Sequence, residues 1–272
     1  MVRKISFRII IFCLIGIIAI SAYNLIKTYL KYQKARSEYN KISEIALVDP
    51  TQFTGEIDWD ALHKINPDIK AWIYLKDSNI NYPVVKGTDN DFYLHRTIKK
   101  EWDFAGTPFI DYRCENEFDE FNTLIYGHHM QDGSMFNNLS KYLREEDFYK
   151  THKQFELITP EEKYHLIVFT GFYTKADGFI YNYDFNEEDE EYIQEHLDKI
   201  INSNQIANID DVEVTSLDNI VELSTCAYVF EDARCVIIGK LNPWSEEEKA
   251  EALKVQAKID KMNKKSKKKN TD

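Results

Sequence analysis

The sequence predicts a mainly β fold, a barrel or a sandwich with helices on its rim. Short runs rich in β-branched and aromatic residues recur between residues 71 and 241, and turn residues separate them. Helical patterns between these runs are few and short, which is typical of such folds. The hydrophobic fraction of 43% and the aromatic fraction of 14% suit a globular core. No repeat or low-complexity linker interrupts residues 50–244, so we interpret them as one domain.

The predicted elements follow from local periodicity. Asn66-Pro67-Asp68 forms a turn, and the alternating run after it starts the first strand. Further apolar runs of strand length extend to the end of the domain. Strands are expected at 71–75, 80–85, 107–112, 122–126, 156–158, 165–172, 212–214, 220–223 and 236–241, and helices at 57–62, 134–143, 145–152 and 187–202.

An apolar run at residues 9–26 is long enough to cross a bilayer. Basic residues flank it on both sides, so the positive-inside rule gives no orientation. We predict a single-pass membrane anchor, because the apolar pattern continues past Ser21 and a helical stalk at 27–49 follows it. A signal peptide cleaved near Ala19-Ile20-Ser21 is the alternative. Since only a stub, residues 1–8, precedes the run, the body is expected on the extracellular side of the cell membrane.

The net charge of −12 is unevenly distributed. The first 36 residues carry seven positive charges, and residues 245–272 carry a net three, so the middle of the chain carries about −22. An acidic body of this kind excludes nucleic-acid binding through bulk charge. Within residues 245–272, Ser245 and Glu248 form a capping-box signal, which predicts a charged helix to about Met262 and then a basic tail.

The four cysteines show neither a CxxC pair nor the spacing of a zinc site, so no metal and no cofactor is predicted. Cys13 lies in the apolar run, which leaves three cysteines in the body. If the body is extracellular, at least one thiol is free. A disulfide between Cys114 and Cys235 is conceivable, but we expect both to be reduced.

The stretch ELSTCAYVFEDARCVIIGKL, residues 222–241, places two reactive groups at strand ends. Cys226 ends one predicted strand and Arg234 begins the next, so a hairpin would bring them to one end of a sheet. A nearby cation favours the nucleophilic thiolate. Cys235 would point to the opposite face and pack as a small buried residue. The alternative is a structural cysteine beside a surface arginine.

A second stretch, TLIYGHHM, provides histidines at another strand end. Gly127 ends the strand, so His128 and His129 fall in a loop, where catalytic groups are often placed. A cysteine, a histidine and an arginine suffice for acyl transfer: the thiolate attacks, the imidazolium protonates the leaving amine and the guanidinium stabilises the oxyanion. If the pKa values of the cysteine thiol and the histidine imidazole nearly match, only a minor fraction of the enzyme is in the thiolate–imidazolium form. The pH–rate profile is then bell-shaped.

These motifs resemble those of sortases, the membrane-anchored cysteine transpeptidases of Gram-positive bacteria. The family has a TLxTC-like strand end, and here Glu222 replaces its first Thr. The runs INYPVVKGTDNDFYLHR, AGTPFIDYR and LIYGHHMQDGSMFNNL resemble the class B branch in order and spacing, as does a longer segment with a helix before Cys226. The resemblance implies an eight-stranded sortase-type β-barrel with an N-terminal helical extension and peripheral helices over residues 57–241.

The resemblance also implies the site. Cys226 matches the nucleophile, which forms a thioester with the Thr of a sorting motif, His128 matches the catalytic histidine, and Arg234 matches the arginine that orients the substrate and stabilises the oxyanion. His129 is then a bystander. Implied partners are surface proteins with NPxTN-like or related sorting motifs, and a peptidoglycan precursor amine that resolves the thioester. Candidate substrate-binding residues are Ser224 and Thr225 beside the thiol, and Ile180 and Tyr181 in a groove wall.

Two other functions use the same residues. A wall-associated cysteine peptidase would transfer the acyl group to water instead of an amine. A membrane-tethered binding module would leave Cys226 inert. Motifs of serine hydrolases (GxSxG) and of zinc proteases (HExxH) are absent from the sequence.

Overall fold

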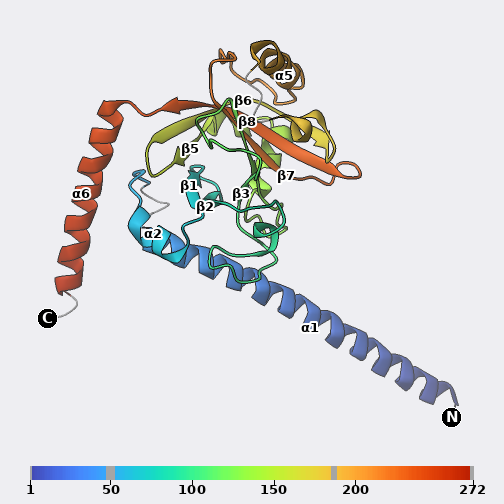
Figure 1. Ribbon diagram of the computed structural model, residues 1–272. Coiled ribbons are helices and arrows are strands. Elements are labelled where there is room, and N and C mark those ends of the chain that lie inside the picture. The colour runs from blue at the N-terminus through green and yellow to red at the C-terminus, as the bar shows by residue number, and fades with distance from the viewer. Residues whose placement is uncertain (1, 47–52, 185–188, 270–272) are drawn as a thin grey trace. The chain divides into compact units, whose positions relative to one another are not determined.

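The computed structural model describes residues 2–46, 53–184 and 189–269. Internal contacts divide the chain into two compact units, Met1–Lys41 and Ile42–Asp272. The first unit lies within the long helix α1 (Val2–Ile45), shown in blue in Figure 1.

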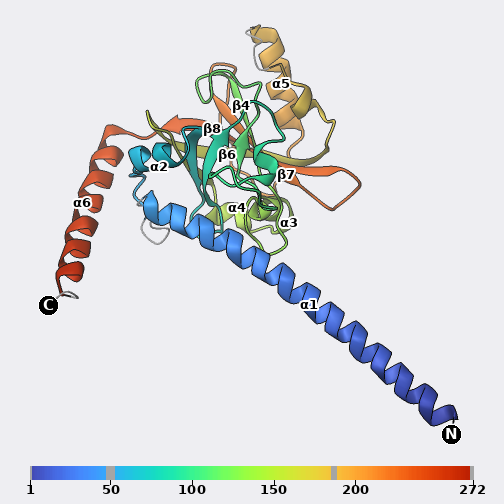
Figure 2. The ribbon, with the colours of Figure 1, turned by 60° about the horizontal axis from the view of Figure 1, so that its bottom comes forward.

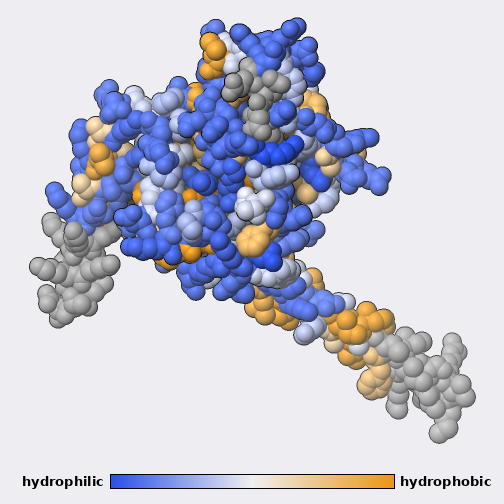
Figure 3. Space-filling model, in the orientation of Figure 1, coloured by the Kyte–Doolittle hydropathy of each residue, from blue (hydrophilic) through white to orange (hydrophobic). Residues whose placement is uncertain are grey.

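Helix α1 carries a strongly apolar surface. Among the described residues, it is the helix that is long and apolar enough to cross a membrane. Figure 3 shows hydrophobic side chains gathered along it, and Phe12, Ile18 and Leu25 are each more than half exposed. Such a surface is unfavourable in water and favourable in a bilayer. The sequence-predicted apolar helix is therefore present, with a length and exposure that suit a membrane anchor and equally a signal sequence.

Eight strands in the second unit form a closed mixed barrel, in the order β1-β2-β3-β4-β7-β8-β6-β5 (Figures 1 and 2). Two neighbouring pairs, β2 with β3 and β4 with β7, are parallel, and the other pairs are antiparallel. Closure leaves no long unpaired strand edge in the described barrel. The strands are β1 (Ile69–Tyr74), β2 (Asn81–Lys86), β3 (Phe109–Ile110), β4 (Asn122–Tyr126), β5 (Gln154–Ile158), β6 (Lys163–Lys175), β7 (Ile220–Cys226) and β8 (Ala233–Pro243).

The mainly β prediction is confirmed, but one predicted strand is wrong. Residues 212–214 form no strand, although their exposure alternates as a strand pattern predicts. The backbone there has no ladder partner, and the carbonyl of Glu213 instead accepts a hydrogen bond from Lys240 Nζ at 3.0 Å. The alternation of side chains shows which face of a segment is exposed to solvent. A β-strand also requires a neighbouring strand whose backbone groups pair with its own.

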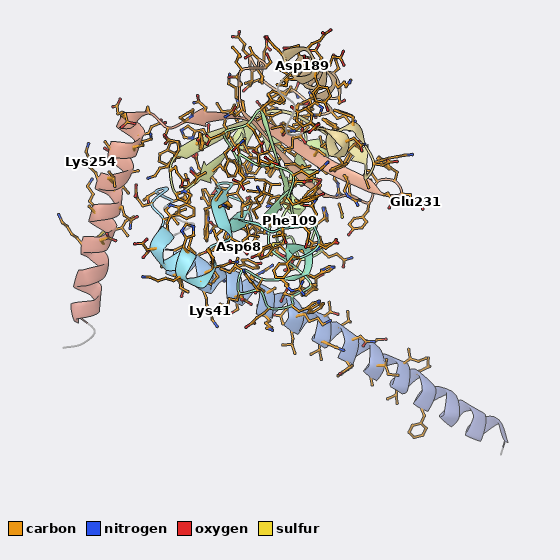
Figure 4. The ribbon with its side chains drawn as sticks, in the orientation of Figure 1. Lys41, Asp68, Phe109, Asp189, Glu231 and Lys254 are labelled. Carbon is orange, nitrogen blue, oxygen red and sulfur yellow. The ribbon has the colours of Figure 1, made fainter. Side chains whose placement is uncertain are left out.

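The described helices that belong wholly to the second unit are mostly short. Helix α5 lies outside the barrel in both ribbon views (Figures 1 and 2). Asp189, labelled in Figure 4, caps it by accepting a hydrogen bond from the Tyr192 backbone N–H at 2.9 Å. Helix α6 continues to Lys269, farther than the predicted end near Met262. The other elements are α2 (Trp59–Ile65), η1 (Tyr93–His95), η2 (Asn137–Ser140), α3 (Lys141–Arg144), α4 (Phe148–Thr151), η3 (Phe179–Asn182), α5 (Glu190–Asn202) and α6 (Glu246–Lys269).

The longest strand pair, β6 with β8, needs a glycine in its middle. Gly171 pairs with Ile237, and a Cβ at Gly171 would lie 2.6 Å from Ile237 Cδ1 and 2.9 Å from Ile206 Cδ1. Because Gly171 has no side chain, Ile206, in the segment after α5, can pack directly against the strand.

We predict that Gly171→Ala destabilises the protein by about 1–3 kcal/mol, because the added methyl overpacks this site. Urea unfolding followed by tryptophan fluorescence measures the change. Ile237→Val removes the atom that the new Cβ would meet, so the double variant should lose less stability than the two single losses together. Full additivity would contradict the overpacking explanation.

Candidate active site

Strand β7 brings the predicted site residues to one edge of the barrel. It pairs with β8 so that Cys226 lies opposite Arg234, and with β4 so that Ser224 lies opposite Tyr126. The Gly127 N–H then donates to the Ser224 carbonyl at 3.0 Å, which carries the pairing one residue past β4. His128 follows directly. The end of β4 and the β7–β8 hairpin, about a hundred residues apart in the sequence, therefore meet at this edge.

Cys226 and Arg234 form the pair of the β7–β8 hairpin that lies nearest its loop. Both side chains are half-buried. Arg234 Nη1 donates to the carbonyls of Ala233 at 3.1 Å and Asp232 at 3.3 Å, so the loop's own backbone holds the guanidinium at the start of β8. The backbone pairing thus places Cys226 and Arg234 opposite each other, at the strand ends that the sequence predicted. The loop between them projects from the barrel, with Glu231 labelled in Figure 4.

Backbone contacts fix the position of His128. Its Nε2 lies 2.8 Å from the carbonyl oxygen of Leu94, in η1. A carbonyl can only accept, so Nε2 carries a proton and Nδ1 is the nitrogen that gains and loses one. The His128 carbonyl accepts a hydrogen bond from the Phe136 N–H at 2.9 Å. Gly127 allows this approach, because a Cβ there would lie 2.6 Å from the Phe136 ring.

A second imidazole lies against His128. The rings of His95 and His128 are stacked, with centroids 5.4 Å apart and planes 19° apart. Burial lowers the pKa of His128, the Leu94 carbonyl opposes this, and the charge of His95 lowers the pKa further. At neutral pH the imidazole is therefore mostly neutral, and the imidazolium needed to protonate a leaving amine is the minor form.

His129 has different neighbours from His128. Its Nε2 lies 2.9 Å from Asn137 Nδ2, and its ring meets Tyr228 edge-on with centroids 5.6 Å apart. Burial lowers the pKa of His129 as well. It contacts η2 and the β7–β8 loop rather than η1, so the two adjacent histidines point into different environments, as expected for neighbours in an extended segment.

The predicted substrate-binding residues are mostly buried. Ser224 is 1% exposed, and its Oγ lies 2.8 Å from the Tyr181 hydroxyl. Thr225 is also buried, and its Oγ1 has no hydrogen-bond partner among the described residues. Ile180 has no exposed surface, so contact with a substrate would require a side-chain movement, whereas Tyr181 is half-buried and accessible.

A polar network under Ser224 was not identified in the sequence. Arg113 binds the buried carboxylate of Asp111 through Nε at 2.9 Å and Nη2 at 2.7 Å, and its Nη1 donates to the Tyr181 carbonyl at 3.1 Å. The Tyr126 hydroxyl donates to Asp111 at 2.9 Å. Burial alone would raise the pKa of Asp111, but these donors lower it below its usual value. Asp111 and Arg113 lie in the conspicuous run AGTPFIDYR, which was the available signal.

The remaining thiols do not belong to the site. Cys235 is fully buried behind Arg234, as predicted, and burial raises the pKa of its thiol. Cys114 is buried as well, and burial raises its pKa too. Cys114, Cys226 and Cys235 are all free, so the expected reduced state is present.

Comparisons with known proteins identify the family. No family model matches the chain. Sortase B of Staphylococcus aureus is 35% identical over 232 residues, which covers 84% of this chain and 93% of that protein. The chain belongs to the sortase B family. A solved S. aureus sortase B–substrate complex superposes with a TM-score of 0.68 at 31% identity, over 79% of this chain and all of that one. A sortase B complexed with triglycine gives 0.67 at 32%, over 78% and 99%.

Membership confirms the class B resemblance and the eight-stranded barrel with its long N-terminal helix and peripheral helices. As a sortase B, the protein is a cysteine transpeptidase. At neighbouring ends of β7, β8 and β4, the barrel places Cys226, Arg234 and the segment that carries His128.

We predict that His95→Asn raises the pKa of His128 in this sortase B. The substitution removes the imidazole whose charge opposes protonation of His128 and lets more water reach its ring. NMR titration of the His128 Cε1–H signal, in a Cys226→Ala background that removes coupling to the thiol, measures the change. An unchanged or lower pKa would show that the stacked ring has no electrostatic effect on His128.

Proposed function

We propose that this sortase B cleaves a C-terminal sorting motif of surface proteins and transfers the new acyl end to an amine of a peptidoglycan precursor. The observation that carries the proposal is the register of the strands. It pairs Cys226 with Arg234 and aligns β7 with the end of β4, which His128 follows by two residues. The sortase B complexes of relatives with a substrate and with triglycine support a peptide substrate and a glycine-type amine acceptor.

In the first half-reaction, the Cys226 thiolate attacks the carbonyl carbon of the scissile peptide bond. The oxyanion that forms is stabilised by the guanidinium of Arg234, a fixed donor at the strand end. His128 gives its Nδ1 proton to the leaving amine as the C–N bond breaks, and a thioester remains on Cys226. By resemblance, the acyl residue is the Thr of an NPxTN-like motif.

In the second half-reaction, an amine attacks the thioester carbonyl. Neutral His128 takes the proton that the amine loses, through Nδ1, since Nε2 is committed to the Leu94 carbonyl. The C–S bond breaks, the thiolate of Cys226 is regenerated, and an amide joins the surface protein to the acceptor. Water in place of the amine would make the enzyme a peptidase.

The proposed domain organisation places this chemistry outside the cell. Residues 1–8 form a cytoplasmic stub, 9–26 a single-pass anchor and 27–49 a stalk, followed by the catalytic domain at 50–244 and a charged helix and tail at 245–272. The exposed apolar side chains of α1 support the anchor. Surface-protein substrates and wall amines are both reached from the outer face of the membrane.

We predict that the full-length enzyme in detergent cleaves one of three peptides that carry NPxTN, SPxTG or LPxTG motifs. With added triglycine, mass spectrometry should detect the amine-ligated product, and Cys226→Ala should abolish it because the thioester cannot form. A product that is only the free acid would favour the peptidase. No turnover, together with a thiol that methanethiosulfonates do not label, would favour the binding module.

We predict that His128→Ala lowers kcat/KM by about 10²- to 10⁴-fold, because the leaving amine loses its proton donor. His129→Ala is the matched control. It removes an adjacent, partly buried histidine that bonds to Asn137, so its effect should stay below about tenfold. Peptide cleavage rates over a pH series measure both. Equal losses in the two variants would contradict the assignment of His128.

A further inference from the structure

Glu222 is a fully buried carboxyl on the strand that carries the nucleophile. It has no exposed surface, and it lies two residues before Ser224 and four before Cys226. Strand β7 pairs without a bulge, so Glu222, Ser224 and Cys226 share one face. A buried carboxyl is unfavourable unless it has a polar partner. The family signature has Thr at this position, so a specific feature of this chain must accommodate the acid.

The partner is His196 of α5. Its Nε2 lies 3.4 Å from Glu222 Oε1, and the imidazole is 6% exposed. The ring packs against Tyr183 in a tilted arrangement, with centroids 4.2 Å and planes 38° apart, and meets Phe179 edge-on at 5.6 Å. His196 therefore connects the end of η3 and the middle of α5 to the barrel strand.

The segment that contains η3 and α5 contacts this face of β7 at a second point. Tyr181 of η3 bonds to Ser224, the next residue on that face, and Cys226 is the next after it. The residues of η3 and α5 thus cover the face up to the thiol. A substrate that reaches Cys226 from this side would lie against η3, so the position of η3 and α5 against β7 affects how that substrate fits.

The polar pair favours one docking arrangement rather than adding much stability. Burial raises the pKa of Glu222, and contacts with His196 and then Asn122 oppose the rise. Glu222 Oε2 has no hydrogen-bond partner among the described residues. A well-packed apolar pair would have a lower desolvation cost, but it would allow α5 to slide along the strand. The hydrogen bond between Glu222 and His196 depends on direction and does not allow this.

We propose that Glu222 and His196 are a positioning pair that holds η3 and α5 against the catalytic strand and thereby sets the enzyme's affinity for its peptide substrate. The inference rests on the proposed function, because it concerns binding of the sorting motif. Neither residue touches the reacting atoms, so the pair acts on KM and not on the chemistry of the thiol.

The test compares variants of the full-length enzyme in detergent. His196→Phe keeps a ring against Tyr183 and Phe179 but leaves Glu222 unpaired, and should raise KM for the cleaved peptide by about tenfold or more with little change in kcat. Glu222→Gln keeps the shape and an oxygen that accepts from Nε2, so it should retain the KM of the parent enzyme. Glu195→Gln, on the exposed side of α5, is the matched control.

Hydrogen exchange of α5 tests the pair without any turnover. His196→Phe should speed exchange in Glu190–Asn202 while β7 and β8 keep their protection and Cys226 keeps its rate of methanethiosulfonate labelling. If no peptide is cleaved, the proposed function fails, but the exchange result still decides about the pair. Unchanged KM and exchange in His196→Phe would overturn the inference. So would a loss of protection throughout the barrel, or a Glu222→Gln variant as impaired as His196→Phe.

Discussion

The site depends on the backbone pairing of β7 with two neighbours. Its antiparallel ladder with β8 places Cys226 opposite Arg234, and its parallel ladder with β4 aligns Ser224 with Tyr126. A shift of one residue in either ladder would turn the side chains to the other face. Because both ladders lie inside a closed barrel with buried side chains on both faces of β7, such a shift is strongly disfavoured, and the reactive groups are held by the most ordered part of the fold.

Backbone groups rather than acidic side chains orient the reactive residues. The Leu94 carbonyl fixes the tautomer of His128, and carbonyls of Asp232 and Ala233 hold the guanidinium of Arg234. Neither contact adds a full negative charge to the site, so the guanidinium stays available for a developing oxyanion. Burial and His95 keep the imidazole mostly neutral. The consequence is that His128 is held in one orientation and that only a minor fraction of it is protonated at neutral pH.

Two buried carboxyls, Asp111 and Glu222, differ in how completely their charge is paired. Asp111 is fully paired by Arg113 and Tyr126, and the network extends through Tyr181 to Ser224. Glu222, on the same strand face as Ser224, lies 3.4 Å from His196, a longer contact, and its Oε2 has no hydrogen-bond partner among the described residues. The first arrangement is satisfied and rigid, and the second is incomplete. Both arrangements connect the segment that contains η3 and α5 to β7. The proposed binding of substrate and the proposed chemistry therefore depend on the same set of contacts.

The sequence by itself determined the mainly β class, the strand ends at Cys226, Arg234 and Gly127, and the apolar N-terminal helix, because periodicity and turn residues are local signals. It could not exclude a strand at 212–214, since strand pairing is non-local. Only the tertiary structure decided that His128 faces Leu94 and His95 while His129 faces Asn137, and that Ile180 is buried. It also decided that Glu222 meets His196. The His128–Leu94 and Glu222–His196 contacts join residues 34 and 26 positions apart, so the tertiary fold selects them rather than any local preference.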